Sequence, residues 1–233
     1  MPPKRSHPFR RHRTVALSGI DAVIFGVTDM AEAKRFLDDW GVTQISVDAD
    51  RLVYQTRDGA EVIVRPIDAP DLPAPIESGN TVREVIWGAD NAQELDKTLT
   101  RLKAGGGVET GADGLARICD PNGLSIAFRV SRRRAVAVAP TPVNAPGAHN
   151  RVNRRSPIHE RAHPITIGHV VMFAGDFQAM RSFYTERLGF VISDEYPNHG
   201  VFTRCQIVGE HHNLFILNRP GKPGVNHVAF TVS

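Results

Sequence analysis

Hydrophobic and polar positions follow the same order in two distant parts of the chain. Residues 19–42 read GIDAVIFGVTDMAEAKRFLDDWGV, and residues 167–190 read IGHVVMFAGDFQAMRSFYTERLGF. Each segment predicts an apolar strand, a turn ending at an aspartate suited to a helix N-cap, and an amphipathic helix followed by a C-cap glycine. The apolar positions at helical spacing are Met30, Ala33, Leu37 and Trp40 in the first copy and Phe177, Met180, Tyr184 and Leu188 in the second. Two such segments indicate an internal repeat.

More strands are predicted after each helix. In the first copy, alternating residues predict a hairpin around Asp58-Gly59, a strand leading into a second helix, and a hairpin with the turn Asp120-Pro121-Asn122-Gly123. The corresponding ranges are 51–58, 60–67, 81–90, 91–106 and 115–130. The chain therefore reads as an α+β fold of tandem βαβββ units. The second copy follows the same course, but Ser233 comes before its second helix and hairpin, so we expect this unit to be truncated at its C-terminus.

A segment without helical or strand period separates the copies. Residues 135–164 are rich in Pro, Asn, Arg and Ala. We predict four parts: a disordered basic tail over 1–14, an N-terminal pair domain over 15–131, a Pro/Arg-rich linker over 132–164, and an incomplete C-terminal domain over 165–233.

Composition excludes several classes of protein. The 233 residues are 41% hydrophobic, which is enough for a packed core, but no apolar run approaches the roughly 18 residues that span a membrane. The net charge of +3 is concentrated in the tail and linker, both of which we expect to be solvated, so we expect no nucleic-acid partner. Cys119 and Cys205 have no CxxC spacing, and no secretory signal follows the basic N-terminus. Buried free thiols and a cytoplasmic location are expected.

Histidines stand on strand-like segments where a plain sheet would carry valine. His211, His212 and His227 lie within GEHHNLFILNRPGKPGVNHVAF, and His169 lies in the first strand of the second copy. Strands that curve around one cavity would bring alternate side chains together. Two histidines and one carboxylate suit Fe(II), because they leave open positions for a substrate and O2.

The duplicated unit with its DPNG turn resembles the vicinal oxygen chelate superfamily of glyoxalases, bleomycin-resistance proteins and extradiol dioxygenases. The resemblance covers nearly all of residues 16–233 except the linker, and EHHNLFIL is most similar to the two-domain type I extradiol ring-cleavage dioxygenases. It implies that His169 and His227 bind the metal and that His212 is the catalytic acid/base, with an unperturbed pKa near the working pH. The third ligand of that family, a glutamate on the last hairpin, has no counterpart before Ser233.

The first copy departs from the same ligand pattern. Aligning Phe25 with Phe173 puts Asp21 opposite His169, and the strand over 81–90 puts Arg83 opposite His227. The DPNG hairpin puts Ala127 where a glutamate would stand. A single weak ligand and a cation cannot hold a metal ion, so we expect only the C-terminal unit to be catalytic.

The resulting prediction is a cytoplasmic Fe(II)-dependent extradiol dioxygenase, with Mn(II) or Zn(II) as alternative metals. Its partners would be a small aromatic diol and O2, without nucleic acid or membrane, and homo-oligomer formation stays open. A chain lacking the third ligand could be inactive. The alternatives are a glyoxalase-like or epimerase metal enzyme and a metal-free small-molecule binding protein. Other residues receive structural roles: His211 solvent-facing, His199 in a turn, Tyr184 and Met180 in the helix core, and Asp176 as an N-cap.

Overall fold

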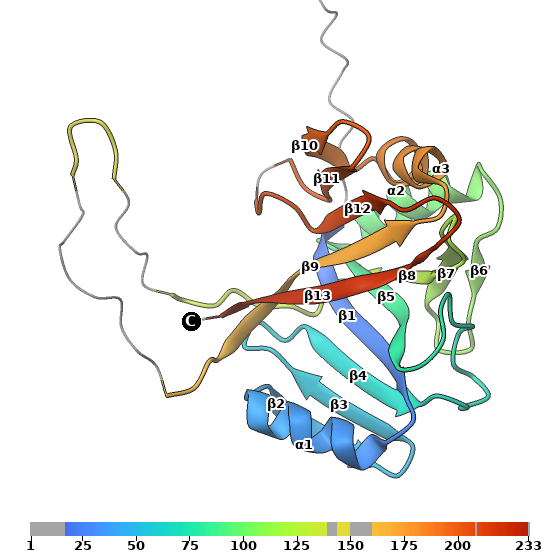
Figure 1. Cartoon of the computed structure of the whole chain (residues 1–233), viewed down its shortest axis with the longest axis vertical. Helices are drawn as coiled ribbons and strands as arrows, with labels where there is room; N and C mark the ends of the chain where they lie inside the picture. Colours follow the sequence, from blue (N-terminus) through green and yellow to red (C-terminus); the bar gives the residue numbers. More distant parts are fainter. Residues whose placement is uncertain (1–16, 139–143, 150–159, 208, 233) are drawn as a thin grey trace, which may run out of the picture.

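Two β-sheets organise the computed structural model, which describes residues 17–138, 144–149, 160–207 and 209–232 (Figure 1). The N-terminal unit contains β1 (Leu17–Val27), α1 (Met30–Trp40), β2 (Thr43–Asp48), β3 (Arg51–Gln55), β4 (Glu61–Pro66), β5 (Thr81–Ala89), α2 (Ala92–Lys103), β6 (Glu109–Thr110), β7 (Ala116–Cys119) and β8 (Ser125–Val130). The C-terminal unit contains β9 (Pro164–Ala174), α3 (Phe177–Ser182), the π-helix η1 (Phe183–Arg187), β10 (Val191–Tyr196), β11 (Gly200–Arg204), β12 (Leu214–Asn218) and β13 (Gly224–Val232). This α+β architecture of repeated βαβββ units is the predicted one.

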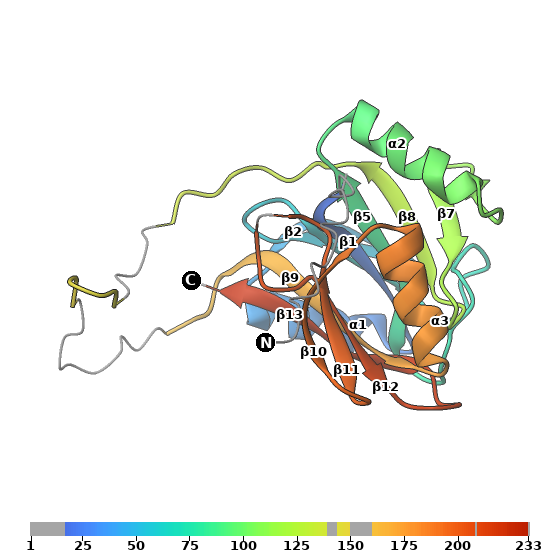
Figure 2. The same cartoon turned by 90° about the horizontal axis from the view of Figure 1, so that it is seen from above.

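Strand pairing repeats between the two units. The eight-stranded sheet has the order β2-β3-β4-β1-β5-β8-β7-β6, and the five-stranded sheet has the order β10-β11-β12-β9-β13. The first strand of each unit lies between a parallel neighbour, β4 or β12, and an antiparallel neighbour, β5 or β13. Within the described chain, β13 is an edge strand (Figure 1). α2 lies over β5 and β8, and α3 lies over β12 (Figure 2).

The turns between strand and helix are fixed by local chemistry that the sequence already indicated. The Asp29 carboxylate accepts the N–H of Glu32 at 2.8 Å, and the Asp176 carboxylate accepts the N–H of Ala179 at 3.0 Å. Both bonds satisfy helix donors that would otherwise lack partners. Gly41 ends α1 with a φ of 94°, a left-handed conformation that glycine adopts without steric cost.

The helix of the C-terminal unit, α3, differs from the regular helix that the spacing predicts over residues 177–188. It changes after Ser182 into the wider turn of η1, where Leu188 donates its N–H to the carbonyl of Phe183, five residues earlier, at 3.0 Å. Such insertions widen a helix locally. Phe183 and Tyr184 are both buried at this turn, as is Met180 in the helix before it.

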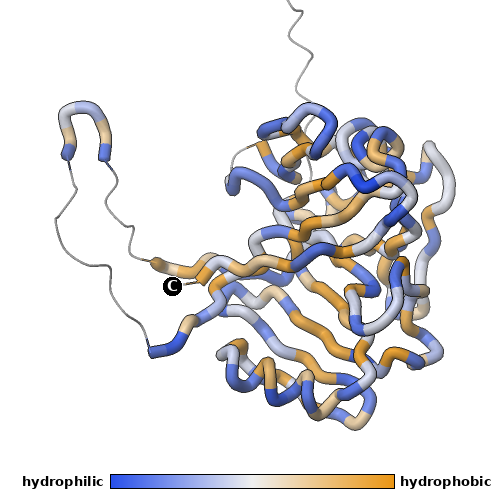
Figure 3. The backbone as a smooth tube through the Cα atoms, in the orientation of Figure 1, coloured by the Kyte–Doolittle hydropathy of each residue, from blue (hydrophilic) through white to orange (hydrophobic). Residues whose placement is uncertain are grey.

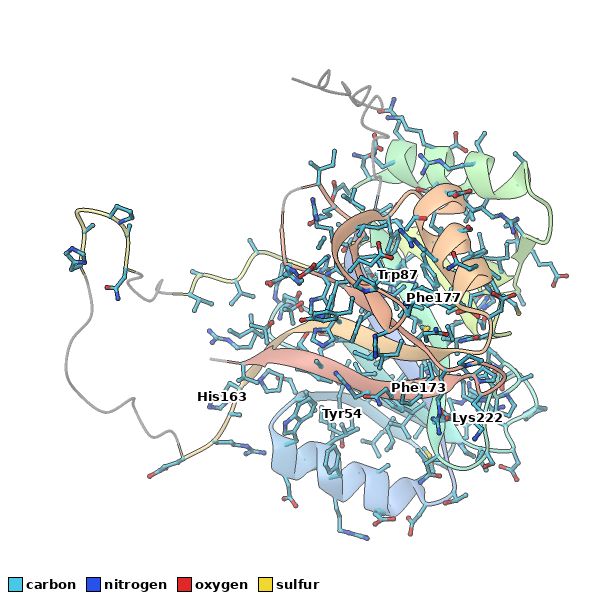
Figure 4. All side chains as sticks on the ribbon, turned by 45° about the horizontal axis from the view of Figure 1, so that its top comes forward. Tyr54, Trp87, His163, Phe173, Phe177 and Lys222 are labelled. Atoms are coloured by element: carbon cyan, nitrogen blue, oxygen red, sulfur yellow. The ribbon has the colours of Figure 1, made fainter. Side chains whose placement is uncertain are left out.

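One large hydrophobic core joins the two units. Its apolar residues come mainly from strands, which form the hydrophobic stretches of the tube in Figure 3. Trp87 from β5, which is labelled in Figure 4, meets Phe190 of the C-terminal unit edge to face; their ring centroids are 4.9 Å apart. Trp40 of α1 meets Phe230 of β13 in the same way at 4.4 Å. Aromatic contacts therefore connect the units at two places.

The DPNG turn also connects the units, a role that its sequence does not reveal. Asn122 donates its side-chain N–H to the carbonyl of Phe173 at 2.8 Å and accepts the N–H of Gly175 at 3.1 Å. Tyr184 donates its hydroxyl to the Asp120 carboxylate at 3.1 Å. The turn thus attaches the N-terminal sheet to the strand end and helix of the C-terminal unit.

Two expectations about surface residues are wrong. The Arg133 side chain is only 19% exposed, and its guanidinium lies 3.5 Å from Asp21 and 3.6 Å from Asp58, so the beginning of the linker is bound to the N-terminal unit rather than solvated. Cys119 is exposed because it follows the inward-facing Ile118 on β7, whereas Cys205 is buried as expected.

The predicted tail over 1–14 and much of the linker lie outside the described residues. No helix in the described part has the length and apolar content to cross a membrane.

Candidate active site

The neighbouring strands β9 and β13 of the C-terminal sheet bring the two predicted metal ligands together. In the antiparallel pairing of β9 with β13, His227 lies opposite Val171, and Ala229 lies opposite His169. These positions share one face of the sheet because side chains alternate along each strand. The Nε2 atoms of His169 and His227 are 3.4 Å apart, and their ring centroids are 5.5 Å apart. His169 is half-buried and His227 is exposed.

The predicted acid/base joins this pair from the other neighbouring strand. His212 precedes β12, the parallel neighbour of β9, and its ring centroid is 4.2 Å from that of His169. His211 is exposed, as predicted. Its Nδ1 nevertheless lies 3.1 Å from Nδ1 of His212. Both residues lie before β12 begins, so their side chains do not point to opposite faces as they would in a strand. Three imidazoles from three segments therefore converge.

An aromatic wall beside His212 was missed by the sequence reasoning. Phe202 of β11 and Phe215 of β12 form a cross-strand pair whose rings stack at 3.8 Å with an angle of 9° between their planes. The Phe202 ring is also 4.8 Å from His212. The available signal was one phenylalanine in each of two short strands, VFTR and LFIL, but the register that pairs them comes from the fold. The wall gives one side of the site a flat apolar surface.

Burial and mutual repulsion favour the neutral form of the histidines. Burial first, and then the neighbouring charges of His212 and His227, together lower the pKa of His169 from 6.5 to about 4. The pKa of His212 is also lowered, first by burial and then by His211 and His227. The expectation of an unperturbed His212 is therefore wrong. Neutral imidazoles have the lone pair that both metal binding and proton acceptance require.

The His169–His227 pair fits two positions around one metal ion. Their Nε2 atoms face each other at 3.4 Å, so both imidazoles could bind the same metal ion. The same spacing also allows an N–H···N bond between the rings. Across the described residues, no group of three histidine, cysteine or acidic side chains could hold a metal. The described residues thus place two candidate ligands, His169 and His227, together.

Structural roles predicted for other residues agree with their positions. Tyr184 and Met180 are fully buried core residues, and Asp176 is the N-cap of α3. His199 is exposed in the turn between β10 and β11, where its Nδ1 lies 2.9 Å from the carbonyl of Pro197. It therefore offers a histidine outside the cluster for comparison.

The N-terminal unit carries different residues at the corresponding positions. His169 lies seven residues before the N-cap Asp176, and Ala22 lies seven residues before the N-cap Asp29. Five residues before each N-cap, Val171 pairs with His227 and Ile24 pairs with Glu84. Ala22 and Glu84 therefore occupy the positions of the two histidines.

The predicted counterparts, Asp21 and Arg83, are wrong by one residue. Irregular pairing of β1 with β5 occurs next to both positions, and a slip of one residue moves a side chain to the opposite face. Asp21 is buried and accepts the Nε–H of Arg129 at 2.5 Å, while Arg83 donates to the carbonyl of Pro73 at 2.6 Å. Ala127 does lie on the face of Ala22, in the same small apolar cluster.

Comparison with known families supports the same superfamily as the resemblance. The model of the Glyoxalase/Bleomycin resistance protein/Dioxygenase superfamily matches residues 166–233, which include all three histidines of the cluster. No curated protein sequence matches the chain.

Solved structures share the fold over almost the whole chain. The Mn(II)-bound glyoxalase from Novosphingobium aromaticivorans is 25% identical, with a TM-score of 0.65 over 92% of this chain and 65% of its own. The 2,3-dioxygenase LapB from Pseudomonas sp. KL28 is 17% identical, with a TM-score of 0.66 over 94% and 76%. Homoprotocatechuate 2,3-dioxygenase from Brevibacterium fuscum is 16% identical, with a TM-score of 0.66 over 96% and 66%. The chain thus spans about two thirds to three quarters of these proteins.

Proposed function

We propose that the protein is an Fe(II)-dependent extradiol dioxygenase of catecholic compounds, on the premise that residues 166–233 match the model of the Glyoxalase/Bleomycin resistance protein/Dioxygenase superfamily. The observation that carries the proposal is the convergence of His169, His212 and His227. Two dioxygenases among the structural neighbours support the reaction class. We propose His169 and His227 as metal ligands and His212 as the proton-transfer group.

Each residue of the cluster has a distinct task in this reaction. Bound Fe(II) would supply chelation of both catechol oxygens and a position for O2. His169 and His227 would hold the ion, and their Nε2 atoms face each other. His212, neutral at pH 7, accepts a proton from a catechol hydroxyl and returns it as the ring opens. The aromatic wall of Phe202 and Phe215 packs against the substrate ring and excludes water.

Metal content and turnover measured on single variants test these assignments. The full chain is reconstituted anaerobically with Fe(II), and ring cleavage of catechol is followed by the absorbance of the yellow ring-opened semialdehyde. His169→Ala and His227→Ala should each lose iron measured by mass spectrometry. His212→Ala should keep iron and lose about 10²–10⁴-fold in turnover, the usual contribution of a general acid/base. Iron retention by all three variants with normal turnover would overturn the assignment.

A matched control is available in the same unit. His199→Ala removes an exposed imidazole that lies in a different turn. It should leave both iron content and turnover unchanged. Equal losses in His199→Ala and His169→Ala would show that histidine replacement acts through folding rather than through the proposed site.

A second function is favoured by one observation. Of the three solved structures described above, the Mn(II)-bound glyoxalase has the highest identity, 25%. A glyoxalase-type enzyme would use the same two histidines for Mn(II) without needing His212 as a proton-transfer group. Reconstitution with Mn(II) and assay with methylglyoxal and a thiol separates the two functions. Activity there, preserved in His212→Ala and absent with catechol, would favour the glyoxalase reaction.

A reducing compartment is proposed from the thiols. Cys119 and Cys205 are free, and one is exposed to oxidants while the other is buried. Burial raises the pKa of Cys205 to about 12, so this thiol is unreactive. We therefore propose the cytoplasm as the site of action, which localisation of the tagged protein would test.

A further inference from the structure

The concave face of the N-terminal sheet lines a cavity of about 410 Å³ that the proposed reaction does not use. Its floor is apolar and belongs to a small buried cluster separate from the main core, with Val53, Ile63 and Ile86 as members and Ile24 and Leu115 packed against it. Alternation along β1, β3 and β4 points these side chains away from the helices. The volume falls within the range of about 300–1,000 Å³ typical of small-molecule sites.

An exposed hydrophobic residue stands at the same cavity. Ile45 on β2 is 51% exposed and lines it, next to Ser46. The pairing of β2 with β3 is irregular between Gln44 and Ser46, which is why both Ile45 and Ser46 reach the cavity. A ligand with an apolar body would cover this isoleucine.

Two of the arginines in the cavity wall are neutralised by carboxylates. Arg117 donates to Glu84 at 2.8 Å and to Asp113 at 2.7 Å. Glu84 also accepts the hydroxyl of Ser125 at 2.7 Å. The carboxylates of Glu84 and Asp113 are hydrogen-bonded to the Arg117 guanidinium and the Ser125 hydroxyl, so they present no free negative charge to a ligand.

The second arginine is bound in the same manner. Arg129 donates to Asp21 at 2.5 Å and to Glu61 at 2.8 Å. Asp21 also accepts the hydroxyl of Ser131 at 2.6 Å and lies 3.5 Å from Arg133. Three guanidiniums therefore offset three of the four carboxylate charges on or behind the cavity wall, and two hydroxyls donate hydrogen bonds to these carboxylates without adding charge.

Two further arginines lack such compensation. Arg51 begins β3 on the face of Val53, and Arg132 follows β8; both line the cavity and are exposed. Among the described residues, no carboxylate lies within 4.0 Å of either guanidinium. Asp71, whose pKa the charge of Arg51 helps to lower from a distance, is already bound by Arg65 at 2.7 Å. The uncompensated charge at the cavity is therefore positive.

We propose that this cavity binds a small organic anion with an apolar body, of the class of aromatic monocarboxylates. The ring would lie on the isoleucine and valine floor, and the carboxylate would accept hydrogen bonds from Arg51 and Arg132. Planar guanidiniums match the two oxygens of a carboxylate. The site includes neither iron nor His169, so its ligand binding can be tested separately from the proposed dioxygenase reaction.

Benzoate and its neutral analogue benzamide test the site directly. The full chain carrying ¹³C-labelled isoleucine methyl groups is titrated with each probe. Benzoate should shift the methyl signals of Ile24, Ile63 and Ile86 and bind about tenfold more tightly than benzamide, since one charge-assisted hydrogen bond exceeds 1.4 kcal/mol. Shifts confined to Ile207 and Ile216 of the C-terminal unit would place the probe elsewhere and overturn the proposal, as would equal affinity for both probes.

Arginine variants give the second arm of the test. The double variant Arg51→Gln/Arg132→Gln should lose about tenfold or more in benzoate affinity while its benzamide affinity stays unchanged. Both arginines are exposed, so the fold, checked by the remaining methyl signals, should persist. Arg35→Gln, which removes an exposed charge from α1, is the matched control and should bind benzoate as the unaltered chain does. Equal losses in the control and the double variant would mean nonspecific charge attraction and refute the site.

Discussion

Replacing the buried carboxylate of Asp120 should change how the stability of the protein depends on pH. Asp120 is 4% exposed in the turn between β7 and β8, and its side chain accepts hydrogen bonds from the N–H groups of Asn122 and Leu124 and from the Tyr184 hydroxyl. Burial raises its pKa from 3.8 to about 6, although these bonds favour the charged form. Asp120→Asn keeps the size of the side chain and the oxygen that accepts both N–H groups.

The sign and size of the effect follow from proton linkage. The native protein keeps a proton on Asp120 that the unfolded chain releases between about pH 3.8 and pH 6, so this group favours folding below pH 3.8 and loses its contribution as pH rises through 6. A pKa difference of about 2 corresponds to about 3 kcal/mol. Asparagine does not titrate. The unfolding free energy of the variant minus that of the unaltered chain should therefore rise by about 3 kcal/mol as the pH increases from 4 to 7.

Urea unfolding at several pH values measures this difference. The lowered pKa of His169 makes the free energy of unfolding rise with pH over the same range. This contribution is present in both proteins, so it cancels in the difference between them. Asp176→Asn is the control for the substitution itself, because Asp176 is an exposed N-cap and asparagine caps equally well, so the free energy of unfolding at pH 7 should change little. A pH-independent difference for Asp120→Asn would refute the conclusion that burial penalises this carboxylate.

Two other substitutions test contacts that hold the units and loops. Trp40→Ala should lower the free energy of unfolding by about 2–3 kcal/mol in urea denaturation, because it removes the edge-to-face contact with Phe230 that joins α1 to β13; a loss below about 0.5 kcal/mol would contradict this role. Arg83→Met should release the segment over 67–73, since the Arg83 guanidinium donates to the carbonyls of Ile67 at 3.3 Å and Pro73 at 2.6 Å. Limited proteolysis should then cut this segment several-fold faster, and unchanged cleavage would show that other contacts hold it.

The repeat was predictable because its signals are local. The N-cap aspartates Asp29 and Asp176 and the C-cap glycine Gly41 act within one turn of chain, so their residue types announce the helix ends. Alternating apolar residues likewise marked the strands. The convergence of His169 with His227 was also within reach, since the repeat makes their strands neighbours and alternation then orients the side chains.

What could not be predicted depends on register and tertiary packing. Irregular pairing between β1 and β5 decides that Glu84, and not Arg83, shares the face of Ala22, and no residue type in the sequence announces it. The pairing of Phe202 with Phe215 needs the register of β11 with β12. Contacts between segments far apart in the chain select these arrangements, so sequence spacing alone leaves them open.

The two units show how one scaffold supports different chemistry at equivalent positions. An imidazole such as His169 can be partly buried in its neutral form without a counter-ion, which leaves its lone pair available. In the N-terminal unit, Glu84 occupies the position of the other histidine, His227; this carboxylate is fully buried and must be compensated, and Arg117 and Ser125 bind its oxygens. Replacing imidazole by carboxylate on this face therefore brings arginine with it. That exchange removes free metal-binding lone pairs from the N-terminal concave face and makes arginine, rather than histidine, the side chain that a ligand there would meet.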